Sequence, residues 1–196
     1  MENLTISDSS DNFQTWINKT FIPENLRNSL VKASVLILPE ESFRNETYPL
    51  FPVTTDQLFQ YLRINLPENS VDLCIDDSNY RELALHSDYK RIGKFIVVAA
   101  FIPVFINCLS NYITETYIKK DEAKPNIIII NQKSQNAEPQ TAPKKYMEST
   151  KVKFSVIVVD SNGTSKEYKY EGPAKDVNNV AEQMKKLSSN DTTRNN

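Results

Sequence analysis

The sequence predicts an α/β (α+β) fold, in which a small mixed sheet packs with a long apolar helix and is followed by a C-terminal ββα unit. A strand covered on both sides is predicted by the continuous apolar run ASVLIL (33–38). A helix is predicted by the uncharged stretch from Phe95 to Thr114. A β-hairpin and an amphipathic helix are predicted by two alternating segments around DSNG (160–163) and the apolar spacing that follows them.

Length and charge exclude few functions. A chain of 196 residues allows one ordinary domain or two small ones. The 23 basic and 25 acidic side chains leave a formal net charge of -2, so the whole molecule has no attraction for phosphate backbones or anionic lipid surfaces. Nucleic acid is therefore not an expected partner.

Cysteine usage and the N-terminus favour an intracellular protein. Cys74 and Cys108 have no neighbouring cysteine, which indicates neither a disulfide framework nor a structural zinc site. The first residues lack a basic segment followed by an apolar run, so they do not resemble a secretory signal. We expect a cytoplasmic location, with membrane association as the alternative. Heavy use of Asn, Ile and Lys is typical of a low-GC bacterial genome.

The N-terminal half is expected to mix helices and strands. Residues 1–20 should form a polar tail and a first helix, and residues 21–131 an α/β domain. Apolar positions from Phe13 to Leu30 predict two short helices separated at Pro23. Leucines at helical spacing within 54–66 predict a helix of about three turns, with Thr54 or Thr55 as N-cap.

The next patterns predict a hairpin and the long helix. Apolar residues alternate with polar ones in 71–76 and again in 81–86, and the turn residues DSN lie between them. We expect these segments to pair as a hairpin with one solvent-exposed face. The apolar helix should begin after Asp88 and span 88–118. A further buried strand is predicted by the four isoleucines at 127–130.

The C-terminal third is expected to hold a flexible linker over 132–150, a ββα module over 151–187 and a disordered tail over 188–196. A unit of fewer than about 40 residues buries little apolar area by itself. The module should therefore dock on the N-terminal domain, on another subunit or on a different protein.

Catalytic chemistry is sparse in this sequence. Glycine occurs only at 93, 163 and 172, which rules out a P-loop or a GxGxxG phosphate cradle. With His86 as the one histidine, HExxH zinc chemistry is excluded. We predict no catalytic, cofactor-binding or metal-binding residues and no enzyme activity. The alternative is a small hydrolase-like enzyme that uses Asp76, Asp77 and His86.

Each of two charged clusters allows a functional interpretation and an interpretation as ordinary solvated surface. The acidic cluster could hold a hard cation, but a solvated strand surface is favoured because its spacing matches no EF-hand. It consists of Asp72, Asp76, Asp77, Glu82 and Asp88. The basic cluster could contact nucleic acid or acidic lipids, or serve solubility alone. It consists of Lys144, Lys145, Lys151 and Lys153, near Tyr146.

The apolar stretch 95–114 allows two interpretations. About 20 uncharged residues would cross a hydrocarbon core of about 30 Å. Against a lipid-facing helix stands a polar stripe at helical spacing, formed by Asn107, Ser110, Asn111 and Thr114. The stripe favours a buried or partner-binding helix over a membrane span.

The C-terminal pattern supports one resemblance. The segment VKFSVIVVDSNGTSKEYKYEGPAKDVNNVAEQMKKL (152–187) combines Asp160, Gly163 and Thr164 with an amphipathic helix. It resembles the effector-associated constant components of bacterial conflict systems, small strand-turn-strand-helix modules thought to bridge signalling and effector parts. The resemblance covers under a fifth of the chain, implies a connecting role and transfers no site residues.

We therefore expect a non-enzymatic protein–protein interaction or adaptor module, accessory to a bacterial defence or effector system, whose partner is another protein or a second copy. The alternative is a single-span membrane-anchored protein that uses residues 95–114. The predicted interaction surface comprises Asn107, Ser110, Asn111, Thr114, Val177, Val180, Met184 and Leu187.

Overall fold

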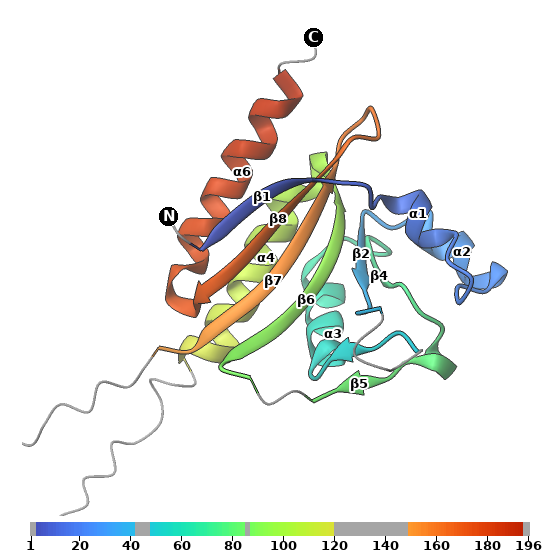
Figure 1. Ribbon diagram of the computed structural model, residues 1–196, viewed down its shortest axis with the longest axis horizontal. Helices are drawn as coiled ribbons and strands as arrows, with labels where there is room; N and C mark the ends of the chain where they lie inside the picture. The colour runs from blue at the N-terminus through green and yellow to red at the C-terminus, as the bar shows by residue number, and fades with distance from the viewer. Residues whose placement is uncertain (1–2, 42–47, 85–86, 120–148, 194–196) are drawn as a thin grey trace, which may run out of the picture.

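A computed structural model describes residues 3–41, 48–84, 87–119 and 149–193, and it confirms the α+β class (Figure 1). The strands are β1 (Leu4–Ser9), β2 (Val35–Leu38), β3 (Phe51–Pro52), β4 (Val71–Leu73), β5 (Glu82–Leu83), β6 (Tyr89–Val98), β7 (Lys151–Val159) and β8 (Ser165–Pro173). The helices are α1 (Phe13–Ile17), α2 (Glu24–Leu30), α3 (Thr55–Asn65), α4 (Ile102–Ile113) and α6 (Val177–Thr193). Short turns are the 3₁₀ segments η1 (Asp77–Asn79), η2 (Ala99–Phe101) and η4 (Ala174–Asp176), and a π-helical turn η3 (Thr114–Ile118) extends α4.

The main sheet has six strands in the order β1-β8-β7-β6-β2-β4. Two neighbouring pairs, β6 with β7 and β2 with β4, are parallel, and the other pairs are antiparallel. Phe95 lies opposite both Ile37 of β2 and Val156 of β7, so β6 is an interior strand. The edges of the sheet are β1 and β4. A separate two-stranded sheet pairs β3 with β5.

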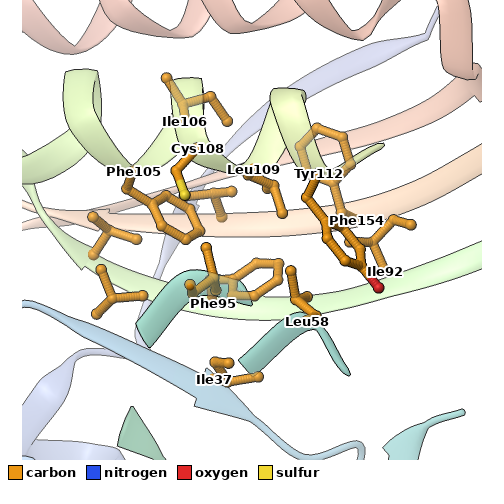
Figure 2. Packing of buried hydrophobic residues seen from close by; sticks show 14 of the residues in the cluster. Ile37, Leu58, Ile92, Phe95, Phe105, Ile106, Cys108, Leu109, Tyr112 and Phe154 are labelled. Atoms are coloured by element: carbon orange, nitrogen blue, oxygen red, sulfur yellow. The ribbon is translucent and has the colours of Figure 1, made fainter. Parts of the chain in front are cut away.

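One face of the sheet is covered by α3, α4 and α6, and the principal core lies beneath them (Figure 2). Phe105 of α4 contacts Phe95 of β6 at a ring-centroid distance of 5.2 Å. Tyr61 of α3 contacts Tyr112 of α4 at 5.2 Å. These apolar contacts hold the helices on the sheet through the hydrophobic effect.

The opposite face is covered only in part. Trp16 of α1 and Leu30 of α2 pack with Leu36 of β2 and Ile96 of β6 in a second, smaller core. The Asn12 side chain accepts a hydrogen bond from Thr15 N–H and starts α1 as an N-cap. Ile157 of β7 also belongs to this smaller core, whereas among the described residues none of β8 or β1 does.

Several predicted elements are confirmed. The run 33–38 contains β2, whose four residues are all buried between β6 and β4. Two short helices fall within 11–30, and α3 falls within 54–66. Thr54 occupies the N-cap of α3 but makes no side-chain cap hydrogen bond. The ββα unit is present, and it docks on the N-terminal part of the chain, because β7 pairs with β6 and α6 packs against α4.

The prediction of one apolar helix over 88–118 is wrong. Residues 89–98 form β6, and α4 begins only at Ile102, with Pro103 in its first turn. The uncharged stretch is mostly apolar because it supplies the end of an interior strand, buried on both faces, and then a largely buried helix. Asp88 therefore precedes a strand and caps no helix. Among the described residues, every helix is too short or too polar to cross a membrane.

The predicted hairpin of 71–76 with 81–86 is also wrong. The first segment contributes β4, which runs parallel to β2, while Glu82 and Leu83 form β5 with β3. Val71 and Leu73 face the main core, and Cys74 is fully buried, so little of this segment is exposed to solvent. Apolar and polar residues alternate in edge strands as well as in hairpin strands, so the pattern does not distinguish the two.

Both predicted tails contain regular structure. Residues 4–9 form β1 and not a polar tail, because all of them pair with residues of β8. At the other end, α6 continues through 188 to Thr193, since neither Gly nor Pro interrupts it. The predicted strand at 127–130 and nearly all of the predicted linker lie outside the described residues.

Candidate interaction site

The predicted interaction surface separates into buried and exposed members. Val177, Val180 and Met184 belong to the main core, so their contacts are made within the chain. Leu187, further along the same helix, remains 39% exposed. Of these four apolar residues, only Leu187 can contribute substantially to a surface for another molecule.

The predicted polar stripe on α4 separates in the same way. Asn107 and Asn111 are exposed and line a shallow hollow of about 370 Å³ beside Tyr61 of α3. Ser110 is buried, and its hydroxyl donates to the side-chain oxygen of Asn178 on α6 at 2.9 Å. Thr114 is half-buried, and its hydroxyl has no hydrogen-bond partner among the described residues. Within the stripe, Ser110 is thus the residue that joins α4 with α6.

The edge strand β1 presents backbone groups that the rest of the sheet does not use. Glu171 N–H donates to the carbonyl of Asn3 at 3.0 Å, which places Asn3 in a hydrogen-bonded pair with β8. Hydrogen-bonded pairs alternate along an antiparallel ladder, so the backbone groups of Leu4, Ile6 and Asp8 point away from β8. Among the described residues, no strand pairs with this outer side of β1.

The opposite edge of the sheet, β4, is blocked. Cys74 N–H donates to Ile37 C=O on β2, and by alternation Leu73 N–H points outward. That outward N–H donates to the side chain of Asp72 at 2.9 Å. A strand of three residues, with the outward N–H of Leu73 already used by a neighbouring carboxylate, is a poor template for pairing.

The edge of β1 has fewer of these protections, and Asp8 is its one charged residue. Its six residues, Leu4–Ser9, contain no Pro, Lys or Arg. The register with β8 is continuous from Leu4 to Ser9, without a bulge. Short strands, inserted charges, prolines and bulges are the usual means by which edges avoid pairing. We therefore take β1 as the candidate site for docking another strand.

Apolar side chains flank this open edge. Ile6 lies opposite Tyr168, on the face of the sheet covered by helices, and is 44% exposed. Asn178 of α6 faces α4, and Leu187 follows it by nine residues, which is about half a turn of rotation in a helix of 3.6 residues per turn. Leu187 therefore points away from α4. α6 packs on β8, the neighbour of β1, while α4 packs on β6 (Figure 1).

The outer face of the sheet carries charges that neutralise one another. Ion pairs join Lys94 with Asp11 at 2.8 Å, Lys169 with Glu167 at 3.0 Å, Lys153 with Glu171, and Arg91 with Glu40 at 3.9 Å. Most of these residues line a hollow of about 350 Å³. Lys153 of the predicted basic cluster is thus paired, while Lys144, Lys145 and Tyr146 lie outside the described residues. Paired cations give little attraction for a polyanion.

Three carboxylates of the predicted acidic cluster, those of Asp72, Asp76 and Glu82, are used in local hydrogen bonds. Asp76 accepts from Ser78 N–H at 3.0 Å and Ser78 Oγ at 2.5 Å, and these bonds lower the pKa of its carboxyl. Asp72 caps the edge of β4. The described residues contain no group of three or more acidic, histidine or cysteine side chains that could hold a metal ion.

Glu82 has a structural role that the sequence did not reveal. Its carboxylate accepts from Thr54 N–H at 3.1 Å, Asp56 N–H at 3.2 Å and Tyr80 Oη at 2.6 Å. Burial raises the pKa of Glu82, but these hydrogen bonds outweigh it and leave the pKa lowered. Glu82 caps the first turn of α3 from β5, in place of Thr54.

The two cysteines are poorly suited to act as nucleophiles. Burial raises the pKa of Cys74 to about 12 and that of Cys108 to about 11, so both thiols are protonated near neutral pH. The residue predicted as the base of an enzyme alternative, His86, lies outside the described residues.

The β1 edge was missed at the sequence level, although a signal for it was present. Leu4 and Ile6 alternate with Thr5 and Ser7, which is the pattern of a half-buried strand. The segment is short and polar, and its pairing partner lies more than 150 residues away in sequence, so alternation alone was weak evidence.

Comparisons of the chain with protein-family models, with curated proteins and with solved structures find no match.

Proposed function

We propose that this chain is a non-enzymatic protein-interaction module whose docking element is the open edge of β1. The observation that carries the proposal is the contrast between the two sheet edges. On β4 the outward N–H of Leu73 is capped by Asp72, whereas on β1 the outward groups of Leu4, Ile6 and Asp8 have no strand beside them among the described residues. A strand added at β1 would satisfy those groups.

Side chains beside the edge support the same role. Strand addition takes affinity from backbone hydrogen bonds and selectivity from side chains at alternate positions. Ile6 provides exposed apolar surface at the edge and would lose solvent contact when a partner docks. The buried, protonated cysteines and the locally bonded carboxylates are consistent with a binding role rather than with catalysis.

The resemblance of residues 152–187 to connecting modules of bacterial conflict systems favours the same class of function. It carries no residue of the β1 edge. A role beside a bacterial defence or effector system therefore stays a prediction.

The proposal is tested by selecting peptides of about 12 residues that bind the full chain from a random display library. Bound peptide should slow hydrogen exchange at the amides of Leu4, Ile6 and Asp8. The variant Ile6→Pro should lose the binding, because it removes one outward N–H while the pairing with β8 does not use that group. Peptides that protect other amides, or that still bind Ile6→Pro, would contradict the proposal.

A further inference from the structure

We infer that the strand that docks on β1 is β1 of a second copy of this chain, in an antiparallel pair centred on Ile6. This inference rests on the proposed function and specifies its partner. Two such copies would join their sheets edge to edge across a two-fold axis.

The backbone of β1 is complementary to itself in this register. The outward residues Leu4, Ile6 and Asp8 are evenly spaced about Ile6. With Ile6 opposite Ile6 of the second copy, Leu4 lies opposite Asp8 of that copy, and every outward residue meets another outward residue. Each of these pairs would exchange both of its N–H···O=C bonds.

Charge does not oppose identical partners at this edge. Asp8 is the one charged residue of β1, and centring on Ile6 keeps the two Asp8 carboxylates from lying opposite each other. Within its own chain, Asp8 lies opposite Lys166 of β8, a basic residue that offsets its charge. With a formal net charge of -2, two whole chains also repel each other only weakly.

The exposed apolar side chains fit the same axis. Ile6 would pack against Ile6 of the second copy on the helix-covered face of the joined sheet, where aliphatic cross-strand pairs stabilise β-structure. This arrangement would cover Ile6, a large apolar side chain that the single chain leaves 44% exposed.

The test is sedimentation velocity of the full chain from about 1 to about 100 μM, a range that separates stable from transient pairing. The wild type should form a dimer whose population rises with concentration. Ile6→Lys should raise the dimer Kd at least about tenfold, because two ammonium groups would meet at the axis. The matched control is Ile64→Lys, which makes the same change at an 81% exposed position of α3 and should leave the Kd unchanged.

A backbone-specific variant completes the design. Ile6→Pro should also abolish the dimer while preserving the circular dichroism spectrum of the monomer. If that variant does not fold, the comparison of Ile6→Lys with Ile64→Lys still decides the outcome. In the wild type, the amides of Leu4, Ile6 and Asp8 should exchange more slowly as concentration rises.

Two results would overturn the inference. One is a wild-type chain that stays monomeric over the whole range, and the other is a dimer that Ile6→Lys and Ile6→Pro leave intact. A monomer whose β1 amides are protected by a selected peptide would overturn the second copy as partner and leave the proposed function standing.

Discussion

Ser110 of α4 donates a hydrogen bond from its hydroxyl to the side-chain oxygen of Asn178 on α6 at 2.9 Å. This bond joins the ββα unit to the helix that precedes it by a long segment of sequence. It also explains how α4 accommodates a buried polar residue, since a buried hydroxyl needs a partner.

We expect Ser110→Ala to lower the free energy of unfolding by about 1 kcal/mol, because one buried hydrogen bond is lost. Urea denaturation followed by circular dichroism measures the change. The control Asn107→Ala, at an exposed position of the same helix, should stay within about 0.5 kcal/mol of wild type. Equal effects of the two substitutions would show that the bond contributes nothing.

A substitution in the core between α4 and β6 should lower the free energy of unfolding more strongly. Phe105 is fully buried against Phe95, and Phe105→Ala should cost about 3–5 kcal/mol by leaving a cavity. Val104 is 47% exposed one residue earlier, so Val104→Ala should cost less than about 1 kcal/mol. A reversed order in urea denaturation would contradict the assigned face of α4.

The turn between β7 and β8 depends on the conformation of Gly163. Its φ of +81° lies in the left-handed region, and an added Cβ would meet no atom within 4 Å. Gly163→Ala should therefore cost about 1 kcal/mol from backbone conformation alone. Thermal unfolding of this variant measures the loss of stability, with Ser161→Ala at a neighbouring exposed position as the control. Similar melting temperatures for the two variants would contradict the left-handed conformation of Gly163.

Asp11 should contribute a pH-dependent part of the stability. Burial raises the pKa of its carboxyl, but the hydrogen bond and charge of Lys94 outweigh burial and leave the pKa below its ordinary value of 3.8. The folded state therefore binds this proton less readily than the unfolded state. The contribution is complete above the unfolded pKa and is lost as pH falls through the folded pKa.

The stability difference between wild type and Asp11→Asn should accordingly shrink as pH falls below about 4. Urea midpoints at several pH values measure it. In a Lys94→Met background, the same substitution should show little pH dependence, because the partner charge is absent. A difference that stays constant with pH in both backgrounds would mean that the pair has no role in acid stability.

The two cysteines should be almost inert in the folded chain. Burial, aided by the charges of Asp72 and Glu41 at Cys74 and of Glu115 at Cys108, raises the pKa of Cys74 to about 12 and of Cys108 to about 11. Reaction with a chromogenic disulfide at pH 8 should be at least about a hundredfold slower than after unfolding in guanidinium, since the thiolate attacks. Rapid reaction of one thiol in the folded chain would show that Cys108, 7% exposed, is accessible.

Local patterns predicted the elements whose signals are contained within a short segment. The hairpin formed by β7 and β8 follows from alternation on either side of Asp160–Gly163, and α3 follows from leucines at helical spacing. The strand β2 follows from an unbroken apolar run. In each case, neighbouring residues supply both the pattern and its structural consequence.

Patterns that fit more than one structure or more than one pairing strand led to wrong predictions. The uncharged stretch 95–114 holds the end of β6 and all of α4, because an interior strand and a buried helix have the same composition. The segments 71–76 and 81–86 alternate as hairpin strands do, yet each pairs with a different strand. Alternation specifies which residues face a core but not which strand lies alongside.

The sequence by itself determined the α+β class, the ββα unit and the scarcity of catalytic groups, because periodicity and residue chemistry are local properties. Only the tertiary structure decided that Val177, Val180 and Met184 are core while Leu187 is exposed, and that β1 and β4 are the two edges of one sheet. Edge position results from pairings between residues as distant as Leu4 and Tyr170. The candidate site is therefore a product of sheet order, which no short segment of sequence encodes.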